Sequence, residues 1–226
     1  MKRIIAIIAI AASMFSAVNA SARGGIIGGF TSSSTKLNKE NLAENAKAVS
    51  LYHVGLTYQM QLPAGFSIQP SILYQMKGTN LSDVGSVTDL KVETKAGYLE
   101  VPVSIQWGPD LVVARPYVFV EPFVGYRLTG TANGSIKIAD LLNITDTKTI
   151  TDAVMGAMPK LEYGFGIGAG VELIQHLQVS IQWFTNLGKL MDENSQVDGA
   201  KVIAAASESL KQQNFSGIKV SAAFFF

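Results

Sequence analysis

The sequence predicts an all-β chain: an eight-stranded antiparallel up-and-down transmembrane β-barrel with short periplasmic turns and long external loops. Three observations predict it. Apolar and polar residues alternate along successive segments, short and long connections follow one another in turn, and no run reaches the ~18 consecutive apolar residues of a membrane helix. The 226 residues fit one domain, which we place at 23–226 after a signal peptide at 1–22.

The N-terminus has the three parts of a secretory signal peptide. Lys2 and Arg3 form a basic region, residues 4–12 form an apolar run, and Ala20-Ser21-Ala22 is an A-x-A cleavage pattern. A membrane anchor is the alternative, but the apolar run is too short to cross about 30 Å of hydrocarbon as a helix. We therefore expect export, with cleavage near Ala22.

The strands follow from period-2 alternation, which places successive side chains on opposite faces. They are predicted, in order, near 24–33 and at 52–62, 66–77, 99–107, 117–128, 162–173, 177–183 and 218–226. The first is rich in glycine, and the fifth carries Tyr117, Phe119 and Phe123 on its polar side. The last ends on Phe224 and Phe226, an aromatic C-terminal barrel signal.

The connections between these strands alternate strictly in length. The short ones are 63–65, 108–112 and 174–176, and the long ones are 34–49, 79–94, 129–159 and 187–215. Outer-membrane barrels show this asymmetry, with tight periplasmic turns and longer external loops. An even number of strands also leaves both termini on the periplasmic side.

Alternation alone does not decide whether the apolar face meets lipid or a core, so a soluble lipocalin-like barrel is the structural alternative. The polar face is mostly Gly, Ser, Thr and Gln, whereas a water-facing surface carries roughly 25–35% charged residues. One strand has glycine at 164, 166, 168 and 170, which suits a crowded interior. We expect the apolar face to meet outer-membrane lipid.

This orientation predicts which residues lie at the membrane interface and which lie in the lumen. The interfacial aromatic residues, on the lipid side near strand ends, are Tyr52, Tyr74, Trp107, Tyr126 and Trp183. The predicted lumen cluster consists of His53, Tyr98, Glu100, Glu121, Arg127 and Lys219. Small membrane barrels are commonly filled by such side chains.

Two chemical alternatives arise inside the lumen. Glu100 and Glu121 lie on adjacent strands and are expected close together, which is how general-acid pairs arise. A serine beside His53 would give a lipid hydrolase. A hydrogen-bonded plug explains both features more simply, so we predict no catalytic residue. His176 belongs to a turn at the other end of the barrel, so the two histidines share no metal, and we expect no cofactor.

The long connections are the better candidates for binding, because scaffolded loops usually carry it. Ile203, Ala206 and Leu210 recur at helical spacing, residues 151–155 suggest a short helix, and residues 42–49 hold a weaker stripe. These patterns predict either lids on the barrel mouth or a docking site for a protein partner.

Four stretches stand out beside the aromatic C-terminus: residues 24–29, 68–78 (IQPSILYQMKG), 98–103 (YLEVPV) and 163–170 (YGFGIGAG). In these stretches the chain resembles the PorT-like outer-membrane β-barrel family, and the resemblance covers essentially the whole mature chain. These motifs reflect barrel architecture rather than chemistry. The resemblance implies a small eight-stranded barrel and a possible link to protein secretion or gliding.

The sequence therefore predicts a non-enzymatic, monomeric outer-membrane barrel that is structural or binds a partner through its external loops. A narrow transport conduit and a lipid-modifying enzyme are the alternatives. The formal net charge of +1 gives no support to a nucleic-acid partner. The absence of cysteine excludes disulfides, thiolate metal sites and a lipidated cysteine anchor.

Overall fold

The computed structural model describes residues 22–35, 46–82, 90–111, 113–138, 142–144, 160–187 and 215–226. The strands are β1 (Ala22–Thr35), β2 (Ala46–Gln61), β3 (Phe66–Ser82), β4 (Leu90–Trp107), β5 (Ala114–Ile138), β6 (Leu142–Ile144), β7 (Leu161–Leu173), β8 (Leu177–Asn186) and β9 (Phe215–Phe225), with a 3₁₀ turn, η1, at Pro63–Gly65. Within these ranges, no helix has the length and apolar character needed to cross a membrane.

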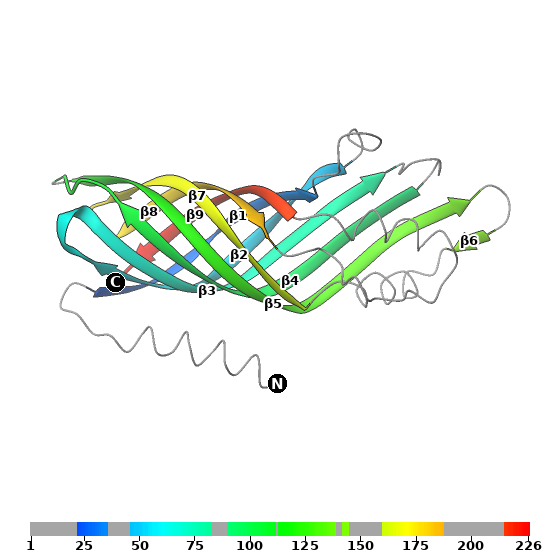
Figure 1. The fold of residues 1–226 in the computed structure, drawn as a ribbon, viewed down its shortest axis with the longest axis horizontal. Coiled ribbons are helices and arrows are strands. Elements are labelled where there is room, and N and C mark those ends of the chain that lie inside the picture. The colour runs from blue at the N-terminus through cyan, green and yellow to red at the C-terminus, as the bar shows by residue number, and fades with distance from the viewer. Residues whose placement is uncertain are drawn as a thin grey trace.

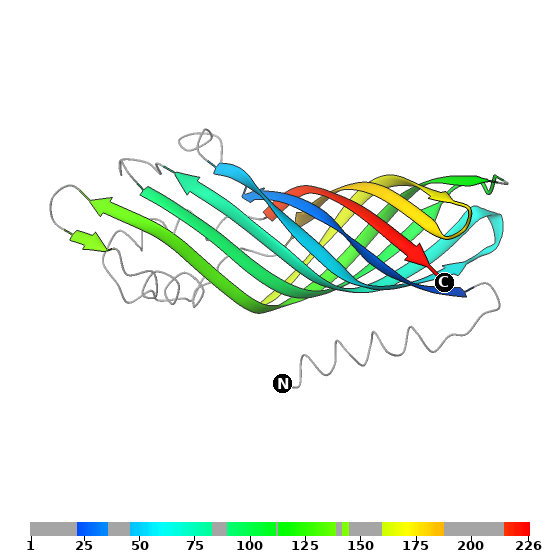
Figure 2. The same cartoon turned by 180° about the vertical axis from the view of Figure 1, so that it is seen from behind.

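Eight of these strands form a closed barrel. Antiparallel pairing runs in the order β4-β3-β2-β1-β9-β8-β7-β5, and β5 pairs back onto β4 to close the cylinder. Figure 1 shows the tilted strands winding around a common axis, and Figure 2 shows the same wall from behind. The remaining strand, β6, pairs with residues 136–138 at the C-terminal end of β5. The predicted eight-stranded up-and-down barrel is confirmed.

The barrel has two different ends. The short connections β2–β3, β4–β5 and β7–β8 lie at one end, with Ala22 and the C-terminal Phe226 (left in Figure 1). We call it the turn end, and the opposite end the loop end. In the β2–β3 turn, Gly65 has φ +78°, and a Cβ there would lie 2.5 Å from the carbonyl oxygen of Gly108. Glycine therefore allows this tight turn to pack against its neighbour.

The strands differ in length, so one side of the wall continues past the other at the loop end. Pairing of β5 with β7 ends at Tyr126–Leu161, whereas pairing of β5 with β4 continues to Ile136–Leu90. We call this continuation the projecting sheet: residues 46–48, 78–82, 90–97, 129–138 and 142–144. Its β5 part, ten residues long, extends about 33 Å along the strand.

The projecting sheet corrects three predicted connections. Parts of 34–49, 79–94 and 129–159 are strand rather than loop, and the stripe assigned to 42–49 is wrong where 46–49 belong to β2. These strands were not predicted because their apolar positions in the sequence, such as Leu90 and Val92, are out of phase with the series from Leu99 to Trp107. The other predicted helical segments, 151–155 and 203–210, and residues 1–21 of the predicted signal peptide lie outside the described residues.

The wall is apolar outside and polar inside. On the outer face Phe30 is 73% exposed and Ile181 is 55% exposed, while on the inner face Lys77 and Gln75 are each 1% exposed. A barrel in water has the opposite arrangement, with its apolar residues inside. The exposed apolar band is the surface expected against lipid, and the core of the molecule is its lumen.

Candidate functional site

The lumen is filled by polar and charged side chains in three layers along the barrel axis. We take these side chains as the candidate site, because they include the buried charged groups of the described residues. Four basic side chains of the lumen form ion pairs with four acidic ones. The basic residues are Arg23, Lys77, Arg115 and Lys219, and the acidic residues are Glu100, Glu121, Glu162 and Glu172.

The layer at the turn end is built around two arginines. Arg23 of β1 contacts Glu172 and Gln59, and its guanidinium lies 5.1 Å from the ring centroid of Phe225. Arg115 of β5 donates to the carbonyl oxygen of Gly65 at 2.9 Å and to Ser67, Gln106 and Asp110. These contacts join strands from all around the barrel, so the layer closes the lumen at this end.

The middle layer holds an ion pair and a histidine. Lys219 Nζ lies 2.7 Å from Glu121 Oε1, and the same oxygen accepts a hydrogen bond from Gln182 at 3.0 Å. His53 Nδ1 lies 3.1 Å from Thr31 Oγ1, and its Nε2 lies 2.9 Å from Ser221 Oγ. Both ring nitrogens of His53 therefore have a hydrogen-bonding partner.

The layer toward the loop end is centred on Lys77, which is 1% exposed. Its Nζ lies 2.8 Å from Glu100 Oε2 and 2.8 Å from Glu162 Oε1, so one ammonium holds carboxylates from two sides of the barrel. Asn186 donates to the other oxygen of Glu162 at 2.7 Å.

Three aromatic rings complete the surroundings of Lys77. Its Nζ lies 4.3 Å from the ring centroid of Phe123, 5.3 Å from that of Phe184 and 5.5 Å from that of Tyr98. A cation within about 6 Å of an aromatic face is attracted by the ring quadrupole, more strongly when water is excluded. The ammonium is thus held by charge, hydrogen bonds and rings together.

Glycines on β7 make room for side chains from the neighbouring strands. A Cβ at Gly164 would lie 2.6 Å from Phe123 Cζ, and a Cβ at Gly168 would lie 2.6 Å from Phe119 Cζ. A Cβ at Gly166 would likewise meet the side chain of Gln182. The period-2 glycine run therefore lies in a crowded interior, as its spacing predicts, against lumen side chains and the backbone of β8.

The predicted pairing of Glu100 with Glu121 is wrong. Glu100 pairs in register with Gly125, so Glu121 is displaced by four residues, about 13 Å along the strand. Each carboxylate bonds to a different lysine: Glu100 to Lys77 and Glu121 to Lys219. The arrangement is that of two separate ion pairs and not of a general-acid dyad.

The other predicted lumen residues occupy separate layers. His53 and Lys219 lie in the middle layer, while Tyr98 lies beside Lys77 and pairs in register with the half-buried Arg127. Lys77 and Glu162 were missed as site residues. Their positions on the polar face of the strands were visible in the sequence, but nothing local indicated that they meet.

The surroundings of His53 resemble a catalytic arrangement only in part. Ser221 is in place for its hydroxyl to donate to Nε2, but Nδ1 meets Thr31 where a hydrolase triad needs an acid. Thr31 also accepts a hydrogen bond from Gln75 at 2.7 Å. His53 and Ser221 are 2% and 6% exposed, which leaves little access for a lipid substrate. The described residues contain no group of three or more acidic or histidine side chains able to hold a metal.

The predicted interfacial aromatics lie on the outer wall. Tyr52 and Tyr74 have ring centroids 6.3 Å apart, Trp183 packs edge-on against Phe165, and Trp107 lies at the turn end beside Phe66. Tyr126 aligns in register with Leu99, the residue that pairs with Tyr74. At the C-terminus, Phe224 and Phe226 are outward and exposed, while Phe225 between them is fully buried.

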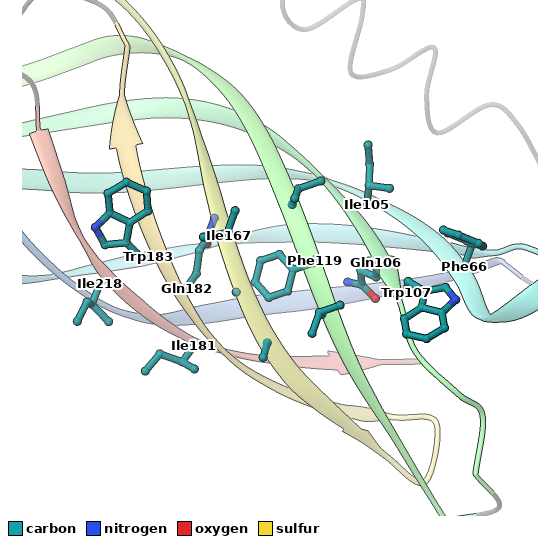
Figure 3. Close-up of a pocket in the computed structure, with 14 residues that line it drawn as sticks. Phe66, Ile105, Gln106, Trp107, Phe119, Ile167, Ile181, Gln182, Trp183 and Ile218 are labelled. Atoms are coloured by element: carbon teal, nitrogen blue, oxygen red, sulfur yellow. The ribbon is translucent and has the colours of Figure 1, made fainter.

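Among the described residues, two hollows border the wall and the lumen layers. A broad, open hollow of about 770 Å³ follows the wall and is lined mainly by outward apolar side chains, including Ile105, Trp107, Ile167, Trp183 and Ile218, as Figure 3 shows. These residues belong to the membrane-facing band, so we assign this hollow to lipid contact. A polar hollow of about 170 Å³ at the turn end borders Arg115, which is already held by its own partners.

Comparison with solved structures finds three proteins of low sequence identity, among others. The attachment invasion locus protein Ail of Yersinia pestis is 11% identical, with 91% of this chain and 99% of that chain covered and a TM-score of 0.41. Neisserial surface protein A is 7% identical over 90% and 97%, with a TM-score of 0.44. OprG of Pseudomonas aeruginosa is 10% identical over 91% and 94%, with a TM-score of 0.36.

The sequence comparisons give one family. No curated protein matches the chain. Residues 12–192 match the family described as "Outer membrane protein beta-barrel domain", a span that contains most of the barrel. Together with the closed barrel and its apolar outer wall, this match shows that the chain belongs to the outer membrane protein β-barrel domain family.

Proposed function

We propose that the protein is a non-enzymatic outer-membrane barrel, structural or partner-binding, that uses its loop end as the contact surface. The filled lumen is the observation that carries this proposal. Ion pairs and hydrogen bonds occupy all three layers, so the barrel works as a rigid support. Of the described residues, the projecting sheet is then the part available to a partner. We assign the loop end to the cell exterior, as in other barrels with short periplasmic turns.

A conduit receives little support from this lumen. An eight-stranded barrel has an interior just wide enough for side chains. Here the arginine layer at the turn end and the Lys77 layer near the loop end both bridge opposite walls. Passage would require several buried ion pairs to separate together. Steady single-channel conductance of the purified barrel would contradict the proposal.

An enzyme receives little support either. The described lumen offers a Ser221–His53 contact without an acid on Nδ1 and with little exposure. We accordingly propose no catalytic residue. A turnover assay on outer-membrane phospholipids tests this, with Ser221→Ala as the matched variant. Hydrolysis lost in that variant would favour the enzyme.

The more specific part of the proposal, a role like that of PorT-like barrels, rests on the sequence resemblance. A PorT-like barrel implies a place in a protein-secretion or gliding apparatus, and we extend the proposal in that direction. Export through a cleaved signal peptide at 1–22 and a monomeric state belong to the same proposal. An assembly component should co-purify with its partner in fixed proportion.

The chain has no cysteine, so one introduced thiol carries a photo-crosslinker to a single position. We would place it at the exposed Thr131 of the projecting sheet, with the outward Val179 in the apolar band and Ile174 at the turn end as controls. Crosslinking in intact outer membranes should give a stoichiometric protein adduct from Thr131→Cys alone. The same adduct from Val179→Cys, or no protein adduct from Thr131→Cys, would contradict partner binding there.

A further inference from the structure

The broad hollow on the outer wall is built from register rows, and these rows give it the shape of a groove. Its upper wall is a single row of outward residues that crosses five strands, from β4 to β9. Successive members of the row pair in register: Ile105, Val120, Ile167, Trp183 and Ile218. All five side chains are apolar and exposed.

The lower wall is the next outward row toward the turn end. It crosses β3 to β8 through Phe66, Trp107, Val118, Ala169 and Ile181. The row between the two walls supplies the other four lining residues: Gln106, Phe119, Gly168 and Gln182. Because side chains alternate between the faces of a sheet, this middle row presents its backbone outward and forms the floor of the groove.

The dimensions of the groove follow from sheet geometry. Walls two residues apart along a strand are separated by about 7 Å, and five strands side by side span about 19 Å. An extended hydrocarbon chain advances about 1.25 Å per carbon, because its C–C bonds are about 1.5 Å long and zigzag. The groove therefore admits one chain across its width, and its length matches about 15 carbons.

The groove climbs through about half of the apolar band. Ile105 lies two residues from the turn-end limit of β4 at Trp107, whereas Ile218 lies seven residues from the limit of β9 at Phe225. The difference of five residues is about 16 Å along a strand, or about 12 Å in height at a tilt near 40°. Half of an apolar band about 25 Å tall has the same height. The groove thus extends from the turn-end boundary to the middle of the membrane, within one leaflet.

Aromatic residues stand at the two ends of the groove. Trp107 lies beside Phe66 near the turn end, and Trp183 lies beside Ile218 at the other end, as Figure 3 shows. Trp183 also packs edge-on against Phe165, with ring centroids 6.2 Å apart, which positions its indole. Between these ends the lower wall has a small side chain at Ala169, and the adjoining floor has glycine at 168. An elongated apolar ligand would meet no large side chain there.

We propose that this groove binds one acyl chain of a phospholipid from the leaflet at the turn end. The occupant follows from the width and length of the groove, from its apolar walls and from its place within a single leaflet. None of the described residues that line it is charged, so the chain is recognised and the headgroup stays at the membrane surface near Trp107. The proposal adds a lipid ligand to the proposed function and needs no protein partner; its assignment to the phospholipid leaflet rests on the proposed orientation.

The test uses the two tryptophans of the chain, both of which line the groove. The full-length barrel is placed in vesicles of diphytanoylphosphatidylcholine, whose methyl-branched chains are too wide for the groove. Phosphatidylcholine with one straight, brominated 16-carbon chain is added in increasing fractions, and quenching of tryptophan fluorescence is measured. Random lipid contact gives quenching in proportion to the brominated fraction. We expect a saturating excess with about a tenfold preference, since dispersion contacts alone select between two apolar environments.

Two variants separate the groove from the rest of the wall. Ala169→Phe fills the groove between its ends and should return quenching to simple proportion. Ala222→Phe is the matched control, because Ala222 is also an exposed, outward alanine but does not line the groove, and it should keep the excess. Folding is checked by the electrophoretic shift between unheated and boiled samples.

If Ala169→Phe does not fold, single-tryptophan variants still decide the question. Trp107→Phe and Trp183→Phe should give the same saturation midpoint, because one chain reaches both ends of the groove. Quenching in simple proportion in the unmodified chain would overturn the proposal, and so would an undiminished excess in Ala169→Phe or unequal midpoints at the two tryptophans. A larger excess with brominated free fatty acid than with phospholipid would overturn the assigned occupant.

Discussion

Replacing Lys77 by methionine should destabilise the barrel strongly. Methionine keeps much of the side-chain volume among the rings of Tyr98, Phe123 and Phe184, so the packing loss is small. The ammonium, however, is the shared partner of Glu100 and Glu162 at 2.8 Å each. Its removal leaves two buried carboxylates without their counter-ion.

The magnitude follows from what remains around those carboxylates. Removing one member of a buried ion pair typically costs about 3–5 kcal/mol, because the other charge stays buried without compensation. Glu162 keeps its hydrogen bond from Asn186 at 2.7 Å, and this contact offsets part of the loss. We expect the free energy of unfolding to fall by about 3 kcal/mol, toward the lower end of that range.

The assay is urea unfolding of the barrel in lipid vesicles, followed by tryptophan fluorescence and by the heat-dependent electrophoretic shift. Lys160→Met, at an exposed lysine directly before β7, is the control and should change the unfolding free energy by no more than about 0.5 kcal/mol. The triple variant Lys77→Met/Glu100→Gln/Glu162→Gln should recover most of the loss, because it removes the uncompensated charges. A cost below about 1 kcal/mol for Lys77→Met, or no recovery in the triple variant, would refute the reasoning.

Three further predictions concern the wall. Gly166→Ala should destabilise the barrel, since the atoms nearest to a Cβ there all belong to the Gln182 side chain, and adding Gln182→Ala should restore the heat stability of the electrophoretic shift; failure to restore it would argue against a steric cause. Val179→Lys in the apolar band should cost about 2–4 kcal/mol in vesicle unfolding, and a cost near zero would place this face outside lipid. On intact cells an impermeant maleimide should label Thr131→Cys but not Ile174→Cys, and the reverse pattern would invert the assigned orientation.

Much of the fold was predictable because strand alternation is a local signal. The outward series on β4, from Leu99 to Trp107, needed only the chain itself to be recognised. The glycine run on β7 and the aromatic residues of β5 were likewise visible on the polar faces of their strands, but their contact across the β5–β7 pair was not predicted. The upper parts of β3, β4 and β5 were missed, because the phase of the apolar residues changes in the sequence, as between Leu90 and Leu99, while the strands continue.

The sequence by itself determined the class of barrel, the number of its strands and which face of each strand is polar. Those properties depend on a period of two residues along one chain, and hydrophobicity decides which face meets lipid. Only the tertiary structure decided which polar residues meet. Lys77 joins Glu100 and Glu162 from different strands, and Glu100 stands apart from Glu121, because the stagger between strands is set when the whole cylinder closes.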